Sequence, residues 1–169
     1  MHIIKIFILL LLFSACTYIG ILISNKYLNR VKDLKEIKKS LNMFSTKIKF
    51  TYEPIPQIFK EISNRTNKNI SELFQNASNN MSKLSAGDAW EKAIVDSNLN
   101  LTKEDKETLK GLGNLLGKLD LDGQVSEIEL VDNFLDTQID SAEEEKKKYV
   151  KMYKTLGITI GLTIVIILI

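Results

Sequence analysis

Histidine and cysteine are almost absent from this chain of 169 residues, since His2 and Cys16 are the only ones and both lie in its apolar first segment. The charged region between Asn25 and Thr155 therefore offers no thiol nucleophile, no histidine base and no Cys/His metal site. A rival interpretation, a membrane hydrolase using carboxylates, needs acids that point inward, whereas the acids here fall on polar helix faces. We expect no enzymatic activity, and no catalytic, cofactor-binding or metal-binding residues.

An excess of charge of either sign is also missing. All Lys and Arg except Lys5 lie between Asn25 and Thr155, where 22 basic residues stand against 21 acidic ones. Such a balance leaves no basic footprint for DNA or RNA. We therefore expect no nucleic-acid partner.

Prolines number only two, Pro54 and Pro56, and no run alternates apolar and polar residues for long enough to predict a strand. Apolar residues instead recur at steps of three and four, as on one face of a helix. Ser85 to Asp88 and Thr102 to Asp105 have the spacing of capping boxes at helix starts. The pattern predicts an all-α fold, an antiparallel bundle of about six helices flanked by N- and C-terminal transmembrane helices.

The first apolar segment runs from Ile3 to Ser24 and is broken only by Lys5. Its uncharged part, Ile6 to Ile23, makes about 27 Å of helix, enough to cross a hydrocarbon core. A cleaved signal peptide and a lipoprotein signal ending at Cys16 are the alternatives. We favour a retained transmembrane helix, because the residues after Cys16 stay apolar.

The second apolar segment, Leu156 to Ile169, follows an amphipathic helix that begins near Val125. Extending this short segment back to Val150 gives a span of 20 residues if two lysines reach back to the surface. Gly157 and Gly161 form a Gly-x-x-x-Gly pattern, which lets two membrane helices approach closely. The pattern is also common by chance, and packing against the first span is sufficient to account for it.

Basic residues flank both apolar segments on the side toward the middle of the chain, and they predict the orientation of the chain. They are Lys26, Arg30, Lys32 and Lys35 after the first segment, and Lys146, Lys147, Lys148, Lys151 and Lys154 before the second. We predict transmembrane helices over residues 1–24 and 156–169, a cytoplasmic domain over residues 25–155, and both termini across the membrane. The lysines also make membrane lipids an expected partner.

Gly111, Gly113 and Gly117 have a spacing that matches neither the dinucleotide fingerprint nor the phosphate loop. Two interpretations stay open for these glycines. They either permit close helix packing and a helix end, or present a backbone surface to a partner.

Four sequence stretches together resemble one known family along nearly the whole chain. They are Ile48-x-Phe50 before Pro54-Ile55-Pro56, the run from Leu84 to Trp90, the spaced residues from Leu109 to Asp120 with Gln124, and Lys151 to Gly157. The chain resembles the stage III sporulation protein AB family of endospore-forming bacteria. It departs from the family's pattern at Lys47, where Glu is usual, and at Phe50, where Tyr is usual.

The resemblance implies a non-enzymatic membrane scaffold of the channel that links mother cell and forespore, in the mother-cell membrane around the forespore. It implies as partners the ATPase called stage III sporulation protein AA and other stage III sporulation channel proteins, and a homo-oligomer stays open. The family is similar to the inner-membrane platform proteins of type II secretion and type IV pilus systems, so a general platform protein is an alternative, as is a channel subunit without ATPase contact.

Two turns are our candidates for partner binding, because turns with small side chains present backbone to a partner. The candidate residues are Pro54, Ile55 and Pro56 in the first turn, and Gly111, Gly113, Gly117 and Asp120 in the second.

Overall fold

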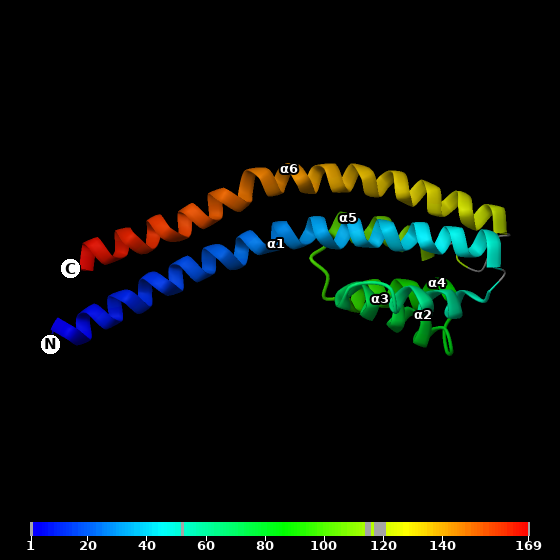
Figure 1. Ribbon diagram of the computed structural model, residues 1–169, viewed down its shortest axis with the longest axis horizontal. Coiled ribbons are helices and arrows are strands. Elements are labelled where there is room, and N and C mark those ends of the chain that lie inside the picture. The colour runs from blue at the N-terminus through cyan, green and yellow to red at the C-terminus, as the bar shows by residue number, and fades with distance from the viewer. Residues whose placement is uncertain (1, 52, 114–115, 117–120, 169) are drawn as a thin grey trace. The chain divides into compact units, whose positions relative to one another are not determined.

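The protein is all-α in a computed structural model that describes residues 2–51, 53–113, 116 and 121–168. These residues form six helices and no strand, which confirms the predicted fold class (Figure 1). The helices are α1 (His2–Thr51), α2 (Ile55–Ser63), α3 (Lys68–Asn80), α4 (Ala86–Asp96), α5 (Lys103–Gly113) and α6 (Leu121–Leu168).

The chain divides into two compact units, and helices α1 and α6 contribute residues to both. Unit 1 contains Met1–Val31 and Ser141–Ile169, and unit 2 contains Lys32–Asp140. These limits differ from the membrane boundaries expected from the sequence. The expected boundaries were placed where the charged residues end, whereas the units are separated where the packing changes. The assignment of residues 25–155 to the cytoplasm stays a prediction.

Unit 2 is built on apolar stripes whose spacing was visible in the sequence. In this unit α6 lies along one side of α1, and α2, α3 and α4 lie along the other (Figure 1). One apolar stripe of each long helix is buried here, and its residues are Leu34, Ile37, Leu41, Phe44 and Ile48 from α1, and Val125, Ile128, Val131, Leu135 and Ile139 from α6.

Four aromatic rings form the centre of this core. Phe59 contacts Phe44, Phe74 and Trp90, with ring centroids 4.9, 5.1 and 5.5 Å apart. The rings come from α1, α2, α3 and α4, so one cluster holds four helices together. Edge-to-face pairs of this kind add about 0.5 to 1.5 kcal/mol each beyond the area they bury.

The predicted capping box at Thr102 is complete, and the one at Ser85 makes one of its two backbone bonds. The Thr102 amide donates to Asp105 Oδ2 at 2.8 Å, and the Asp105 amide donates to Thr102 Oγ1 at 3.1 Å. At the start of α4 the Asp88 amide donates to Ser85 Oγ, also at 3.1 Å. Each bond satisfies an amide that the first turn of a helix otherwise leaves unpaired.

Unit 1 pairs the apolar segments of α1 and α6 through glycines. A Cβ added at Gly157 would lie 3.0 Å from the Cys16 carbonyl oxygen and 3.1 Å from Gly20 Cα. A Cβ at Gly161 would lie 3.3 Å from Cys16 Cβ. The structure therefore places the first apolar segment against the Gly-x-x-x-Gly pattern, the packing that the sequence suggested.

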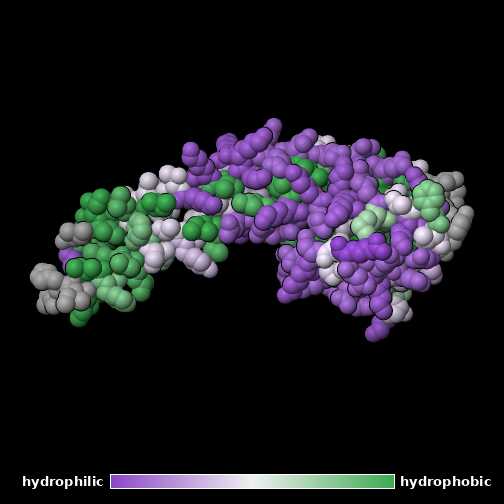
Figure 2. All heavy atoms as spheres, in the orientation of Figure 1, coloured by the Kyte–Doolittle hydropathy of each residue, from purple (hydrophilic) through white to green (hydrophobic). Residues whose placement is uncertain are grey.

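Both segments of unit 1 are long and apolar enough to cross a membrane, and most of their side chains are exposed within the structure. Hydrophobic residues gather on this unit in Figure 2, whereas unit 2 shows a mainly hydrophilic surface. Exposed apolar residues on this scale are typical of a membrane or protein interface rather than of a free aqueous surface.

Candidate functional site

The Pro54-Ile55-Pro56 turn opens helix α2 and is the first of the two sequence-predicted partner sites. Pro54 and Pro56 are exposed and Ile55 is half-buried, while Ile58 and Phe59 that follow are buried. Pro54 has φ −60° and ψ 140°, the extended conformation that suits the residue before a helix. The apolar rings of the turn thus face outward on a helix that is anchored in the core.

Backbone carbonyls of this turn are already used within the fold. The Pro54 carbonyl accepts from the Gln57 amide at 2.9 Å, and the Pro56 carbonyl accepts from Ser78 Oγ at 2.8 Å. The sequence argument expected the turn to present backbone to a partner. The structure instead leaves the proline rings and the Ile55 side chain as the surface that a partner could contact.

Lys47 supplies charge beside this turn, at one of the positions where the sequence departs from the pattern of the family that it resembles. Its Nζ contacts Glu61 Oε2, and it lies 3.8 Å from Glu53 Oε1. Arg65 Nη2 is 2.8 Å from Glu61 Oε1. The hydrogen bond from Lys47 lowers the pKa of Glu61 below its usual value. An acid is therefore present at this corner, but it comes from α2 rather than from position 47.

The glycines of the second sequence-predicted site have different surroundings. A Cβ at Gly111 would meet nothing within 4 Å, so this position is open. A Cβ at Gly113 would lie 2.9 Å from the Gly87 carbonyl oxygen and 3.3 Å from Trp90 Cδ1, and Gly113 is buried. The role of Gly113 is thus close packing of α5 against α4, one of the two interpretations that its spacing allowed. Gly117 and Asp120 lie outside the described residues.

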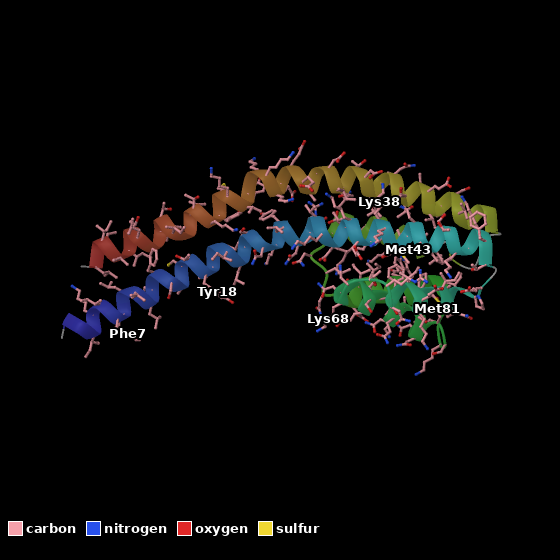
Figure 3. All side chains as sticks on the ribbon, viewed as in Figure 1. Phe7, Tyr18, Lys38, Met43, Lys68 and Met81 are labelled. Atoms are coloured by element: carbon pink, nitrogen blue, oxygen red, sulfur yellow. The ribbon has the colours of Figure 1, made fainter. Side chains whose placement is uncertain are left out.

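Helix α6 carries an acidic surface in unit 2 that the sequence reasoning did not select. Residues 121–140 contain six acids and no Lys or Arg, and this run was the signal available in the sequence. Lys38 of α1 lies between α1 and α6 (Figure 3) and bonds two of these acids, Asp132 at 3.2 Å and Asp136. The hydrogen bond to Asp136 raises the pKa of Lys38 although burial opposes it.

Unit 1 has an aromatic and charged cluster next to its apolar segments. Tyr27 stacks on Tyr153 and makes a tilted contact with Tyr149, with ring centroids 5.8 and 5.1 Å apart. Arg30, which is almost fully buried, bonds Glu145 Oε2 at 2.8 Å. Tyrosines and cations in this arrangement suit the headgroup region of a bilayer.

Metal-ligating residues do not cluster in the part of the chain that the structure describes: it contains no group of three His, Cys, Asp or Glu side chains placed to hold an ion.

Comparison with known proteins identifies relatives along most of the chain. The family model described as stage III sporulation protein AB matches residues 5–169. Stage III sporulation protein AB of Bacillus subtilis (strain 168) is 28% identical over 142 residues, which are 82% of this chain and 83% of that protein. A solved structure of stage III sporulation protein AB superposes with a TM-score of 0.66 at 25% identity, covering 71% of this chain and 98% of the solved chain.

Proposed function

Because the chain belongs to the stage III sporulation protein AB family, we propose that it is a non-enzymatic scaffold of the channel between mother cell and forespore. The apolar segments of α1 and α6 anchor it in the mother-cell membrane around the forespore, with residues 25–155 in the cytoplasm. Its helical unit 2 receives the ATPase named stage III sporulation protein AA. Two membrane-capable segments and membership of a sporulation family support the membrane placement.

The observation that supports the ATPase contact is the apolar turn Pro54-Ile55-Pro56, with two exposed prolines and a half-buried Ile55. Apolar groups at a helix start cost little to bury against a partner, because proline rings lose no side-chain freedom. The turn is held in place by the buried Ile58 and Phe59, so it is ordered before a partner arrives. Preorganised apolar contacts with a charged rim, here Lys47 and its acids, are typical of binding hot spots.

Gly111 is the second position to test, because it is the glycine of the α5 end with open space around it. A long side chain there would be tolerated by the fold but would obstruct a partner that approaches the backbone. Gly113 does not serve this test, since its backbone packs against Gly87 inside the unit.

Co-purification of the detergent-solubilised, tagged chain with the ATPase tests the proposal. Ile55→Glu and Gly111→Arg are expected to weaken retention of the ATPase about tenfold or more, the effect of a charge placed in an apolar contact. Leu84→Glu is the matched control, since Leu84 is an exposed apolar residue in the turn before α4. Glu at position 55 suits the first turn of α2, so the fold should persist.

Unchanged retention in both variants, with the protein folded and membrane-bound, would contradict this binding surface. No retention of the ATPase by the wild-type chain would contradict the ATPase contact itself and favour a structural channel subunit. A general secretion or pilus platform role predicts expression and phenotype outside sporulation.

A further inference from the structure

Opposite charges separate onto the two long helices of unit 2. In α1, residues 32–51 contain six lysines and two acids, and one of those acids, Asp33, is buried and accepts hydrogen bonds from Asn100. In α6, residues 121–140 contain six acids and no basic residue. The other acid, Glu36, is half-buried, and its Oε1 lies 4.0 Å from Lys39 Nζ. Apart from Glu36, each of these helix segments exposes one sign of charge.

Two exposed surfaces result from this separation. The basic face consists of the exposed α1 residues Lys32, Lys35, Lys39, Asn42, Thr46 and Lys49. The acidic face consists of the exposed α6 residues Glu129, Asn133, Asp136 and Asp140, which recur at steps of four and three and so form one stripe of the helix.

The two faces adjoin on one side of the α1–α6 pair. Lys49 belongs to the basic face and Glu129 to the acidic face, and Lys49 Nζ lies 3.2 Å from Glu129 Oε1. Both residues remain exposed while they make this contact. An ion pair between two exposed side chains places their surfaces next to each other, so unit 2 presents a positive and a negative strip side by side.

Two exposed apolar side chains border the acidic face. Leu130 and Phe134 are one helical turn apart and are 48% and 53% exposed. Single exposed apolar residues are ordinary on a protein surface, but an adjacent Leu and Phe beside an acidic strip provide an apolar contact with a charged border.

We propose that two copies of the chain associate through unit 2, with the basic face of each copy against the acidic face of the other. A two-fold axis parallel to the long helices produces this arrangement, because it brings each positive strip opposite the negative strip of the second copy. Such an interface is self-complementary, as closed dimers require.

The ion pairs within one chain define which residues of α1 and α6 lie at the same height along the helix axes; such residues are called level. Lys38 bonds Asp132 and Asp136, and Lys49 bonds Glu129, so the helices run antiparallel in this register. Since both rise 1.5 Å per residue, counting back along α1 and forward along α6 puts Lys32 level with Asp140.

A rotation about an axis parallel to the helices does not change these levels. Lys32 of one copy therefore faces Asp140 of the other, and the aliphatic stem of Lys39 lies level with the apolar pair around Phe134. Lys32, Glu127 and Asp140 make no ion pair among the described residues, so their charges remain to be neutralised. The inference rests on the membrane placement in the proposed function, which keeps copies parallel, and not on the ATPase contact.

Disulfide trapping tests the arrangement with the full chain in membrane vesicles. In a Cys16→Ser background, a chain with Asn42→Cys is mixed with a differently tagged chain with Asn133→Cys, which removes any intrachain disulfide. We expect the mixed disulfide to form faster than either homodimeric one. A Lys68→Cys chain on α3 replaces Asn42→Cys as the control. Equal trapping with the control would overturn the proposal.

Charge reversal provides an independent readout by energy transfer between labelled copies in vesicles. Lys32→Glu and Asp140→Lys each place like charges together twice in a symmetric dimer, so each should raise the dissociation constant about tenfold. The double variant should restore association, and added salt should weaken the wild-type dimer. A double variant as weak as the single variants, or a wild-type chain that stays monomeric, would refute the arrangement.

Phe134→Glu tests the apolar part of the interface against Val95→Glu, a matched exposed apolar position on α4. We expect only Phe134→Glu to weaken the dimer. If it leaves the dimer intact but lowers ATPase retention, the acidic face binds a basic partner protein instead, which refutes the inference. Measuring both properties separates the hypotheses, since a monomer that retains the ATPase overturns only the inference and a dimer without ATPase overturns only the proposed function.

Discussion

Replacing Gly113 by alanine should destabilise unit 2, whereas the same replacement two residues earlier, at Gly111, should stabilise it. Both glycines are in helix α5, so the intrinsic preference of alanine for a helix acts at each position. Their surroundings differ. The new Cβ at Gly113 would come within 2.9 Å of the Gly87 carbonyl oxygen, and at Gly111 it would meet open space.

The expected magnitudes follow from these distances. Forcing an extra carbon into a close-packed contact costs about 1 to 3 kcal/mol, because neither backbone can move alone. Gly111→Ala gains about 0.5 to 1 kcal/mol from reduced freedom of the unfolded chain. Part of the same gain offsets the loss at Gly113. We therefore expect the two variants to differ by about 2 kcal/mol, with opposite signs relative to the wild type.

Trp90 makes the measurement direct, because it is the only tryptophan and it is buried beside the changed position. Its Nε1 donates to the Leu109 carbonyl at 2.7 Å, and its Cδ1 would lie 3.3 Å from the new Cβ at Gly113. Urea unfolding of the detergent-solubilised full chain, followed by tryptophan fluorescence, gives both the stability and the environment of the α4–α5 contact. Gly113→Ala should also shift the emission of the native state.

Equal stability of the two alanine variants would refute this account of Gly113. So would a Gly113→Ala variant with wild-type emission and a raised urea midpoint. Gly87→Ala is the second test of the same contact, since it approaches from α4 and should destabilise in the same direction.

Three further predictions concern other contacts of the fold. Lys38→Met should lower the free energy of unfolding by about 1 to 2 kcal/mol. Because the pKa of Lys38 is raised in the folded state, this loss should be seen below a pH of about 10.4, the pKa of an unfolded lysine, and should vanish as the pH rises further. A difference in urea midpoint between variant and wild type that stays constant at all pH values would contradict this expectation. Trp90→Phe should cost about 1 to 3 kcal/mol, because it leaves the buried Leu109 carbonyl without its donor; a variant that unfolds at the wild-type urea concentration by circular dichroism would argue against that bond. Gly161→Cys should form an intrachain disulfide with Cys16, since the two Cβ positions lie 3.3 Å apart, and mass spectrometry should find no such bond for a cysteine placed one residue later.

Local patterns in the sequence were sufficient for the helices of this protein. Steps of three and four between apolar residues predicted the buried stripes of α1 and α6, and the spacing of Thr102 and Asp105 predicted a capping box. The apolar segments and their basic borders predicted two membrane-capable helices, which the structure contains. These features depend on neighbours within about four residues, so one sequence carries enough information about them.

Tertiary structure alone decided which residues meet across the chain. Gly87 and Gly113 are 26 positions apart, and nothing in their local sequence indicates that their backbones touch. The pairing of Lys47 with Glu61 likewise depends on the bend between α1 and α2.

The same physical reason explains the candidate surfaces. Pro54 and Gly111 could be selected as turn residues from the sequence, but whether their surroundings are open or filled depends on which helices pack beside them. The net charge of the chain is close to zero, so it gave no sign that lysines are concentrated on α1 and acids on α6 within unit 2. Folding places those two helices side by side, and only then do the balanced charges of the chain become two faces of opposite sign.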